Sequence, residues 1–112
     1  MNTNKWGPSA WIFTHTIVAN APEYLTEKQQ EYYKNFFMDL KNILPCSYCR
    51  DSYTQILEVY PIDNYLHKGY LLRWWWYNVH NYVNQKLNKP KGYAPPFEEV
   101  LKKYDNFKAK KN

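Results

Sequence analysis

The sequence lacks the features that several protein classes require. No apolar run approaches the roughly 20 residues needed to span a bilayer. The N-terminal stretch MNTNKWGPSA does not have the basic-then-apolar order of a secretory signal. No repeat, Gly/Ser linker or low-complexity segment divides the 112 residues. We therefore expect a soluble intracellular protein that binds no membrane, with one domain over residues 1–112 and a core at about 6–104.

Positive charge is present but poorly clustered. Fifteen Lys and Arg against ten Asp and Glu give a formal net charge of +5, which makes nucleic-acid binding worth considering. Most of these charges are interspersed with acids, so we expect no nucleic-acid partner. The exception is a group of lysines at the end of the chain, Lys102, Lys103, Lys108, Lys110 and Lys111. The simpler interpretation of this group is a solvated basic tail over residues 105–112.

Strand-like alternation is also missing, and prolines divide the chain into about five segments with helical spacing. A first helix is predicted over residues 8–21, and Thr26 with Gln29 forms a capping box for a second helix that extends to about Ile43. A third is predicted from near Cys46 to Pro61, a fourth over residues 65–88, and a short fifth from Phe97. The pattern predicts an all-α fold, a four-helix bundle with a short fifth helix.

Aromatic residues are unusually frequent, at 20% with five Trp and twelve Tyr, which suggests a planar ligand. Trp74, Trp75 and Trp76 are each turned by about 100° from the next on a helix, so they cannot all face one way. Burying one in the bundle, placing another against a ligand and a third at a subunit contact would satisfy all three. Core packing is the alternative for each.

Cys46 and Cys49 are the only cysteines, and they follow Pro45 at a predicted helix start. Unpaired N–H groups and the helix dipole stabilise a thiolate at such a position. A disulfide between these two residues would close a very small loop and add little stability. Reactivity explains the pair better, so both are candidate catalytic residues.

Zinc binding is the chief alternative, because Cys-x-x-Cys is half of a structural zinc site. His15, His67 and His80 do not form the usual second closely spaced pair, so we expect no metal. An incidental pair of buried thiols is a further alternative. A thioredoxin-like site is disfavoured, since that fold needs strands leading into the Cys-x-x-Cys helix.

A polar but uncharged row lies along the fourth predicted helix. His80 and Asn84 are four residues apart and Asn81 and Asn84 three apart, so their side chains share a surface. Asn is a poor helix former, so the row calls for an explanation. A solvated face beside a core histidine is one interpretation. The other is a ligand with phosphates and a heteroaromatic base, bound by the amides and by Lys86 or Lys89.

Three motifs, taken together, resemble the Erv/ALR flavin-dependent sulfhydryl oxidases in order and spacing. They are WGPSAWIFTH (6–15), LPCSYC (44–49) and HNYVNQKLNKP (80–90), with Trp74 six residues before His80. The sequence looks most like the minimal, single-domain form of the family. The resemblance implies a four-helix bundle with a short fifth helix, FAD at the mouth of the bundle, and a homodimer.

The resemblance also assigns roles to residues. It implies that Cys46 exchanges with a protein dithiol substrate, that Cys49 lies against the flavin and passes two electrons to FAD, and that O2 reoxidises the flavin to give H2O2. The residues implied to bind FAD are Gly7, Trp11, His15, Cys49, His80, Asn81, Asn84, Lys86, Leu87 and Lys89, with Trp74 and Val83 in the same wall.

The sequence departs from the family in its cysteines. Family members often carry a shuttle cysteine pair and a structural disulfide that ties the fourth helix to the segment after it, and this sequence has neither. We place Trp76 where the fourth-helix cysteine would be, and expect packing around Trp76, Phe97 and Tyr104 to hold the final helix. Substrates must then reach Cys46 directly or through a thioredoxin-like carrier. The resemblance to viral oxidases implies the host cytoplasm or the virion, with the mitochondrial intermembrane space as the alternative.

Overall fold

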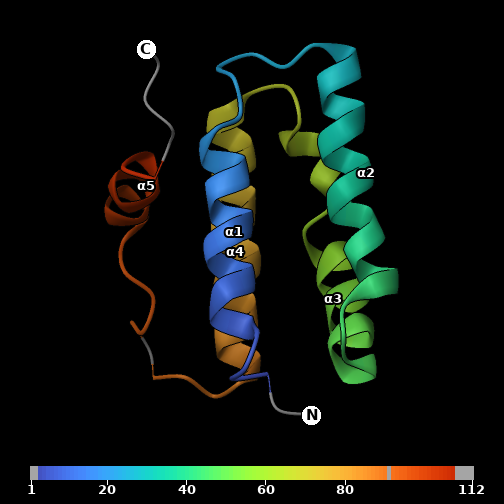
Figure 1. Ribbon diagram of the computed structural model, residues 1–112, viewed down its shortest axis with the longest axis vertical. Helices are drawn as coiled ribbons and strands as arrows, with labels where there is room; N and C mark the ends of the chain where they lie inside the picture. The colour runs from blue at the N-terminus through green and yellow to red at the C-terminus, as the bar shows by residue number, and fades with distance from the viewer. Residues whose placement is uncertain (1–2, 91, 108–112) are drawn as a thin grey trace.

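The chain folds into a bundle of antiparallel helices. The computed structural model describes residues 3–90 and 92–107, so most of the predicted basic tail lies outside it. Figure 1 shows the first and fourth helices as one overlapping pair and the second and third beside it, with the last helix set apart on the outer side of the first. These results confirm the predicted fold. The helices are α1 (Gly7–Ala19), α2 (Glu27–Ile43), α3 (Ser47–Val59), α4 (Gly69–Lys86) and α5 (Phe97–Asp105), with the 3-10 helix η1 (Ile62–Tyr65) before α4.

Local sequence signals set two of the helix starts. Pro8 occupies the first turn of α1, where a missing N–H costs nothing. At α2, Thr26 Oγ1 accepts a hydrogen bond from the Gln29 N–H at 3.1 Å, and the Gln29 side chain accepts one from the Thr26 N–H at 2.9 Å. The predicted capping box is therefore confirmed.

The predicted start of the fourth helix, at Tyr65, is wrong by four residues. Residues 67–69 pair instead with the α1–α2 connection: the Leu25 N–H donates to the His67 carbonyl at 3.0 Å, and the Gly69 N–H donates to the Pro22 carbonyl at 3.1 Å. This pairing needs extended backbone at Lys68. Helix α4 therefore begins only at Gly69, where an added Cβ would lie 2.4 Å from the Pro22 carbonyl oxygen.

The core lies between the α1–α4 and α2–α3 pairs and is rich in aromatic rings. Trp75 is 1% exposed, and its indole N–H donates to the Tyr60 carbonyl at 2.7 Å. The Tyr53 hydroxyl donates to the Phe37 carbonyl at 2.6 Å and so joins α3 to α2. Both of these buried rings thus have a partner for their polar atom, as burial requires. The largest fully buried side chains are Trp75, Phe37, Ile56, Ile62, Leu72, Val18 and Val79.

Helix α5 is held by residues other than the expected Trp76. The Tyr77 hydroxyl donates to the Pro95 carbonyl at 2.6 Å, and the Phe97 ring packs on Tyr77 and Trp74 at 5.3 and 5.1 Å. Trp76 points into the bundle instead, 3% exposed. Successive helical side chains differ by about 100°, so one residue along the helix is enough to move this role from Trp76 to Tyr77.

Three chain segments that carry the predicted site meet at one end of the bundle. Figure 1 places the N-terminus of α1, the α2–α3 connection and the C-terminus of α4 together at its lower end. In the described part of the chain, no helix is long and apolar enough to cross a membrane.

Candidate functional site

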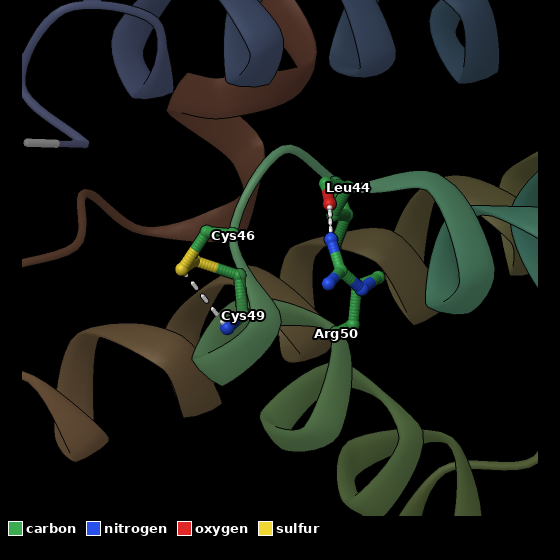
Figure 2. Close-up of a disulfide and its surroundings, with 4 residues drawn as sticks. All are labelled: Leu44, Cys46, Cys49 and Arg50. Carbon is green, nitrogen blue, oxygen red and sulfur yellow. Dashed lines mark hydrogen bonds between the residues drawn. A yellow bond between two sulfur atoms is a disulfide. The ribbon is translucent and has the colours of Figure 1, made fainter. Parts of the chain in front are cut away.

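The two cysteines form a disulfide at the N-terminus of α3. Cys46 is the N-cap of the helix, and its Sγ accepts a hydrogen bond from the Cys49 N–H at 3.1 Å (Figure 2). The sulfur thereby takes the place of the usual Ser or Asp oxygen at this position. The same N–H group and the helix dipole would stabilise a Cys46 thiolate after reduction.

The connection before the disulfide is fixed by Arg50. Its guanidinium donates to the Leu44 carbonyl at 2.6 Å, across the loop from which Cys46 enters α3 (Figure 2). The side chain therefore holds the end of α2 against the start of α3. Sequence reasoning missed this role, because the partner is a backbone carbonyl that no motif indicates.

The two cysteines differ in exposure. Cys46 is buried, with 7% of its surface exposed, whereas Cys49 is half-buried. The predicted roles imply the reverse order for the free protein, with Cys46 open to substrate.

Trp76 of α4 connects α3 with α1. Its ring contacts Tyr53, one helical turn after Cys49, at 6.2 Å, and Trp11 of α1 at 5.3 Å. Its indole N–H donates to Thr14 Oγ1 at 3.0 Å, and Thr14 in turn donates to the Ala10 carbonyl at 2.8 Å. These bonds fix the orientation of Trp76. The disulfide helix is thus linked through packed rings to the predicted cofactor residues.

His15 and His80, 65 residues apart in the sequence, form a hydrogen-bonded pair. His15 Nε2 and His80 Nδ1 are 2.9 Å apart. The His80 ring stacks on Trp11, with centroids 3.7 Å apart and planes 7° from parallel. The structure therefore brings together three of the residues predicted to bind FAD.

Both histidines are neutral at physiological pH. Burial lowers the pKa of His15 to about 3, with further lowering by His80 and Lys103. Burial, again with Lys103, lowers the pKa of His80 to about 4. Each ring then carries one proton, so one nitrogen of the contact donates and the other accepts.

The remaining predicted residues take varied positions along α1 and α4. Asn84 is buried, at 8% exposed, and the Lys86 ammonium donates to the side-chain Oε1 of Gln55 at 3.2 Å. Leu87 is 54% exposed, and the Lys89 ammonium lies over the Tyr93 ring at 5.2 Å. Gly7 begins α1, while Asn81 and Val83 are half-buried on α4.

Trp74 does not join this group. It is 41% exposed, and its ring contacts are with Tyr77 and Phe97, on the side of α4 that faces α5. Trp76 is the tryptophan that touches Trp11 and His15. The helical periodicity of the sequence could have shown this, because His80 lies four residues after Trp76 on the same face of α4.

Trp6 is a further residue that sequence reasoning missed. Its indole N–H is buried and, in the part of the chain that the structure describes, is the one buried side-chain polar atom without a hydrogen-bond partner. Trp6 is also the N-cap of α1, at the same end of the bundle as the disulfide. An unpaired buried donor is costly, and a ligand acceptor would relieve that cost.

These groups fit a cofactor such as FAD. The Trp6 N–H and the Asn84 amide offer donors, Lys86 and Lys89 offer positive charge, and Trp11 with His80 offers flat faces. Phosphates and ring carbonyls are acceptors that suit such a set. Over residues 3–90 and 92–107, no three His, Cys, Asp or Glu side chains come together as a metal site needs.

Comparison with known proteins gives concordant matches. The Erv1/Alr family model matches residues 8–105. The probable FAD-linked sulfhydryl oxidase R368 of Acanthamoeba polyphaga mimivirus is 32% identical over 104 residues, covering 92% of this chain and 73% of that protein. The mitochondrial FAD-linked sulfhydryl oxidase ERV1 of Saccharomyces cerevisiae is 34% identical over 92 residues, 80% of this chain but 47% of the yeast protein.

A solved structure agrees with these matches. The crystal structure of the FAD binding domain of Erv1 from Saccharomyces cerevisiae superposes with a TM-score of 0.83 and 25% sequence identity, covering 95% of this chain and 96% of that one. The match thus includes the bundle and the cysteine connection. From the family model and these relatives together, the chain belongs to the Erv1/Alr family.

Proposed function

We propose that the chain is an FAD-linked thiol oxidase that makes disulfides in protein substrates or in a dithiol carrier. The observation that carries the proposal is the Cys46–Cys49 disulfide at the N-terminus of α3, at the end of the bundle where α1 begins and α4 ends. Relatives named FAD-linked sulfhydryl oxidases support it.

The reaction at the cysteines is a thiol–disulfide exchange. A substrate thiolate attacks Cys46 Sγ, the Cys46–Cys49 bond breaks, and Cys49 leaves as a thiolate. A second substrate thiolate then attacks the sulfur that is bonded to Cys46, so the substrate leaves as a disulfide and Cys46 as a thiolate. FAD bound by these residues would supply a two-electron acceptor for the reduced cysteine pair, and O2, as the final acceptor, would take the two electrons with two protons to give H2O2.

The N-cap position of Cys46 supports its role as the exchanging cysteine. In the second step Cys46 is the leaving group, and a leaving thiolate of low pKa departs faster. The Cys49 N–H, 3.1 Å from Cys46 Sγ, supplies this stabilisation. Only 7% of Cys46 is exposed, so substrate attack on its Sγ requires a local rearrangement.

The roles can be tested by comparing Cys49→Ser with Cys46→Ser. Each remaining cysteine is activated as a mixed disulfide with a small aromatic thiol, in protein loaded with FAD, and capture of a substrate protein that has a single reduced cysteine is followed by mass. We expect Cys46 in Cys49→Ser to capture the substrate faster, and both variants to retain FAD absorbance but consume no O2 with a dithiol. Faster capture by Cys49 would reverse the two roles.

The proposed function extends to the cofactor residues and the assembly. FAD is held by the residues assigned from the resemblance on α1 and α4, with Trp6 added. A homodimer is supported by apolar side chains exposed on neighbouring α1 and α2, such as Phe13 at 62% and Phe36 at 37%. Light scattering at micromolar concentration would show a mass twice that of the chain, and Phe13→Lys would lower it.

A further inference from the structure

We infer that Tyr104 of α5 is a positioning residue for the cofactor site. By stacking on His15 it fixes the His15–His80 pair, and so decides which ring nitrogen of His80 can face a bound cofactor. The inference rests on the proposed FAD site and adds to it a helix that none of the assigned residues belongs to.

Four rings from three helices lie in contact one after another. Tyr104 is buried, and its ring lies on His15 with centroids 4.8 Å apart and planes 11° from parallel. His15 is hydrogen-bonded to His80, whose ring stacks on Trp11. His15 is 4% exposed, so its ring has Tyr104 on one face and little free space elsewhere.

The pair leaves His80 a single free nitrogen. Its Nδ1 is occupied by His15 Nε2 at 2.9 Å, so Nε2 alone is available to a ligand. If His15 donates in this contact, His80 is protonated on Nε2 and offers a donor; if His80 donates, its Nε2 is an acceptor. The contact with His15 therefore sets which nitrogen His80 presents, and the tautomer of the pair sets whether that nitrogen donates or accepts. Tyr104, parallel to the His15 ring, prevents it from turning.

Docking of α5 does not depend on Tyr104 alone. At the other end of the helix, Phe97 packs on Tyr70, Trp74 and Tyr77. No ring contact joins Phe97 to either histidine among the described aromatic pairs. Replacing Phe97 by Leu thus gives a matched control, the same change of ring to aliphatic side chain on the same helix.

The experiment compares Tyr104→Leu, Tyr104→Phe and Phe97→Leu in FAD-loaded protein. FAD dissociation constants are measured by absorbance titration, thermal midpoints by tryptophan fluorescence, and the tautomers of His15 and His80 by ¹⁵N NMR of the imidazole nitrogens. We expect Tyr104→Leu to weaken FAD binding about fivefold to tenfold, from the loss of one aromatic stack, and to shift both histidines' nitrogen signals. Tyr104→Phe, which keeps the stack, should change neither.

The control separates positioning from stability. If Phe97→Leu weakens FAD binding as much as Tyr104→Leu at an equal loss of thermal midpoint, Tyr104 only helps to dock α5 and the inference is wrong. A loss of FAD affinity with unchanged nitrogen signals overturns it as well. If the unmodified protein binds no FAD, the proposed function fails. The imidazole nitrogen signals of the cofactor-free variants then decide the inference alone. Shifted signals in Tyr104→Leu support it, and unshifted signals overturn it.

Discussion

Acidification should destabilise the FAD-free protein through the two buried histidines. The pKa values of His15 and His80 are about 3 and about 4 in the folded chain, against 6.5 for an ordinary histidine. The unfolded chain therefore binds protons that the folded chain refuses. Stability from this difference is fully present above pH 6.5 and is lost as the pH falls from 6.5 toward 4 and then 3.

The magnitude follows from the shifts. At pH 5 the pH lies 1.5 units below the pKa of a histidine in the unfolded chain. Each histidine therefore lowers the free energy of unfolding by about 2 kcal/mol, and the pair by about 4 kcal/mol. This is a large part of the 5–15 kcal/mol that stabilises an ordinary domain. Burial is the main cause of both low pKa values, and Lys103 of α5 lowers both further, so both histidines stay mostly neutral at pH 5 in the folded chain.

Urea unfolding at pH 7, 6 and 5, followed by tryptophan fluorescence, measures the effect. Between pH 6 and 5 the free energy of unfolding should fall with a slope that approaches about 2.7 kcal/mol per pH unit, the value for two protons. His67 is exposed, so His67→Gln should leave this slope unchanged, whereas His15→Gln should remove about half of it. A slope near zero in the unmodified protein would refute the reasoning.

Three further changes test the fold and the cofactor site. Gly69→Ala should lower the free energy of unfolding by about 1–3 kcal/mol, because the new Cβ meets the Pro22 carbonyl oxygen at 2.4 Å; an unchanged urea midpoint would mean that this contact relaxes freely. Tyr77→Phe should lower the free energy of unfolding by about 1 kcal/mol through loss of the hydrogen bond to the Pro95 carbonyl. Because this bond holds the start of α5, the change should also speed proteolysis of the chain after Pro95. Trp6→Phe should raise the FAD dissociation constant while leaving the FAD-free protein nearly as stable, since the indole N–H has no partner to lose; unchanged FAD binding would assign Trp6 to packing alone.

Sequence reasoning succeeded where the signal is local. The Thr26–Gln29 capping box spans four residues, and its two hydrogen bonds are present as expected. The cysteine pair after Pro45 likewise indicated the N-terminus of α3, and Cys46 is its N-cap.

It failed where the partner is distant in sequence. The start of α4 depends on pairing with the α1–α2 connection, more than forty residues earlier in the chain, which hydrophobic spacing does not encode. The His15–His80 bond joins residues 65 apart, so membership of one site could be proposed but not the bond itself. The exchange of roles between Trp76 and Tyr77 shows a third limit, because one position along a helix changes the facing direction by about 100°.

The way α5 is fastened has a consequence for working with the protein under reducing conditions. Tyr77, Phe97 and Tyr104 hold this helix by ring packing and a hydrogen bond, which reductant does not break. Cys46 and Cys49 are the only cysteines in this sequence, so their bond is the one covalent crosslink that reductant can break. A thiol buffer can therefore set the oxidation state of the pair without loosening the scaffold around it. Equilibration against buffers of graded potential should give a single two-electron curve, free of any unfolding transition, so the redox state and the fold of this protein can be varied separately.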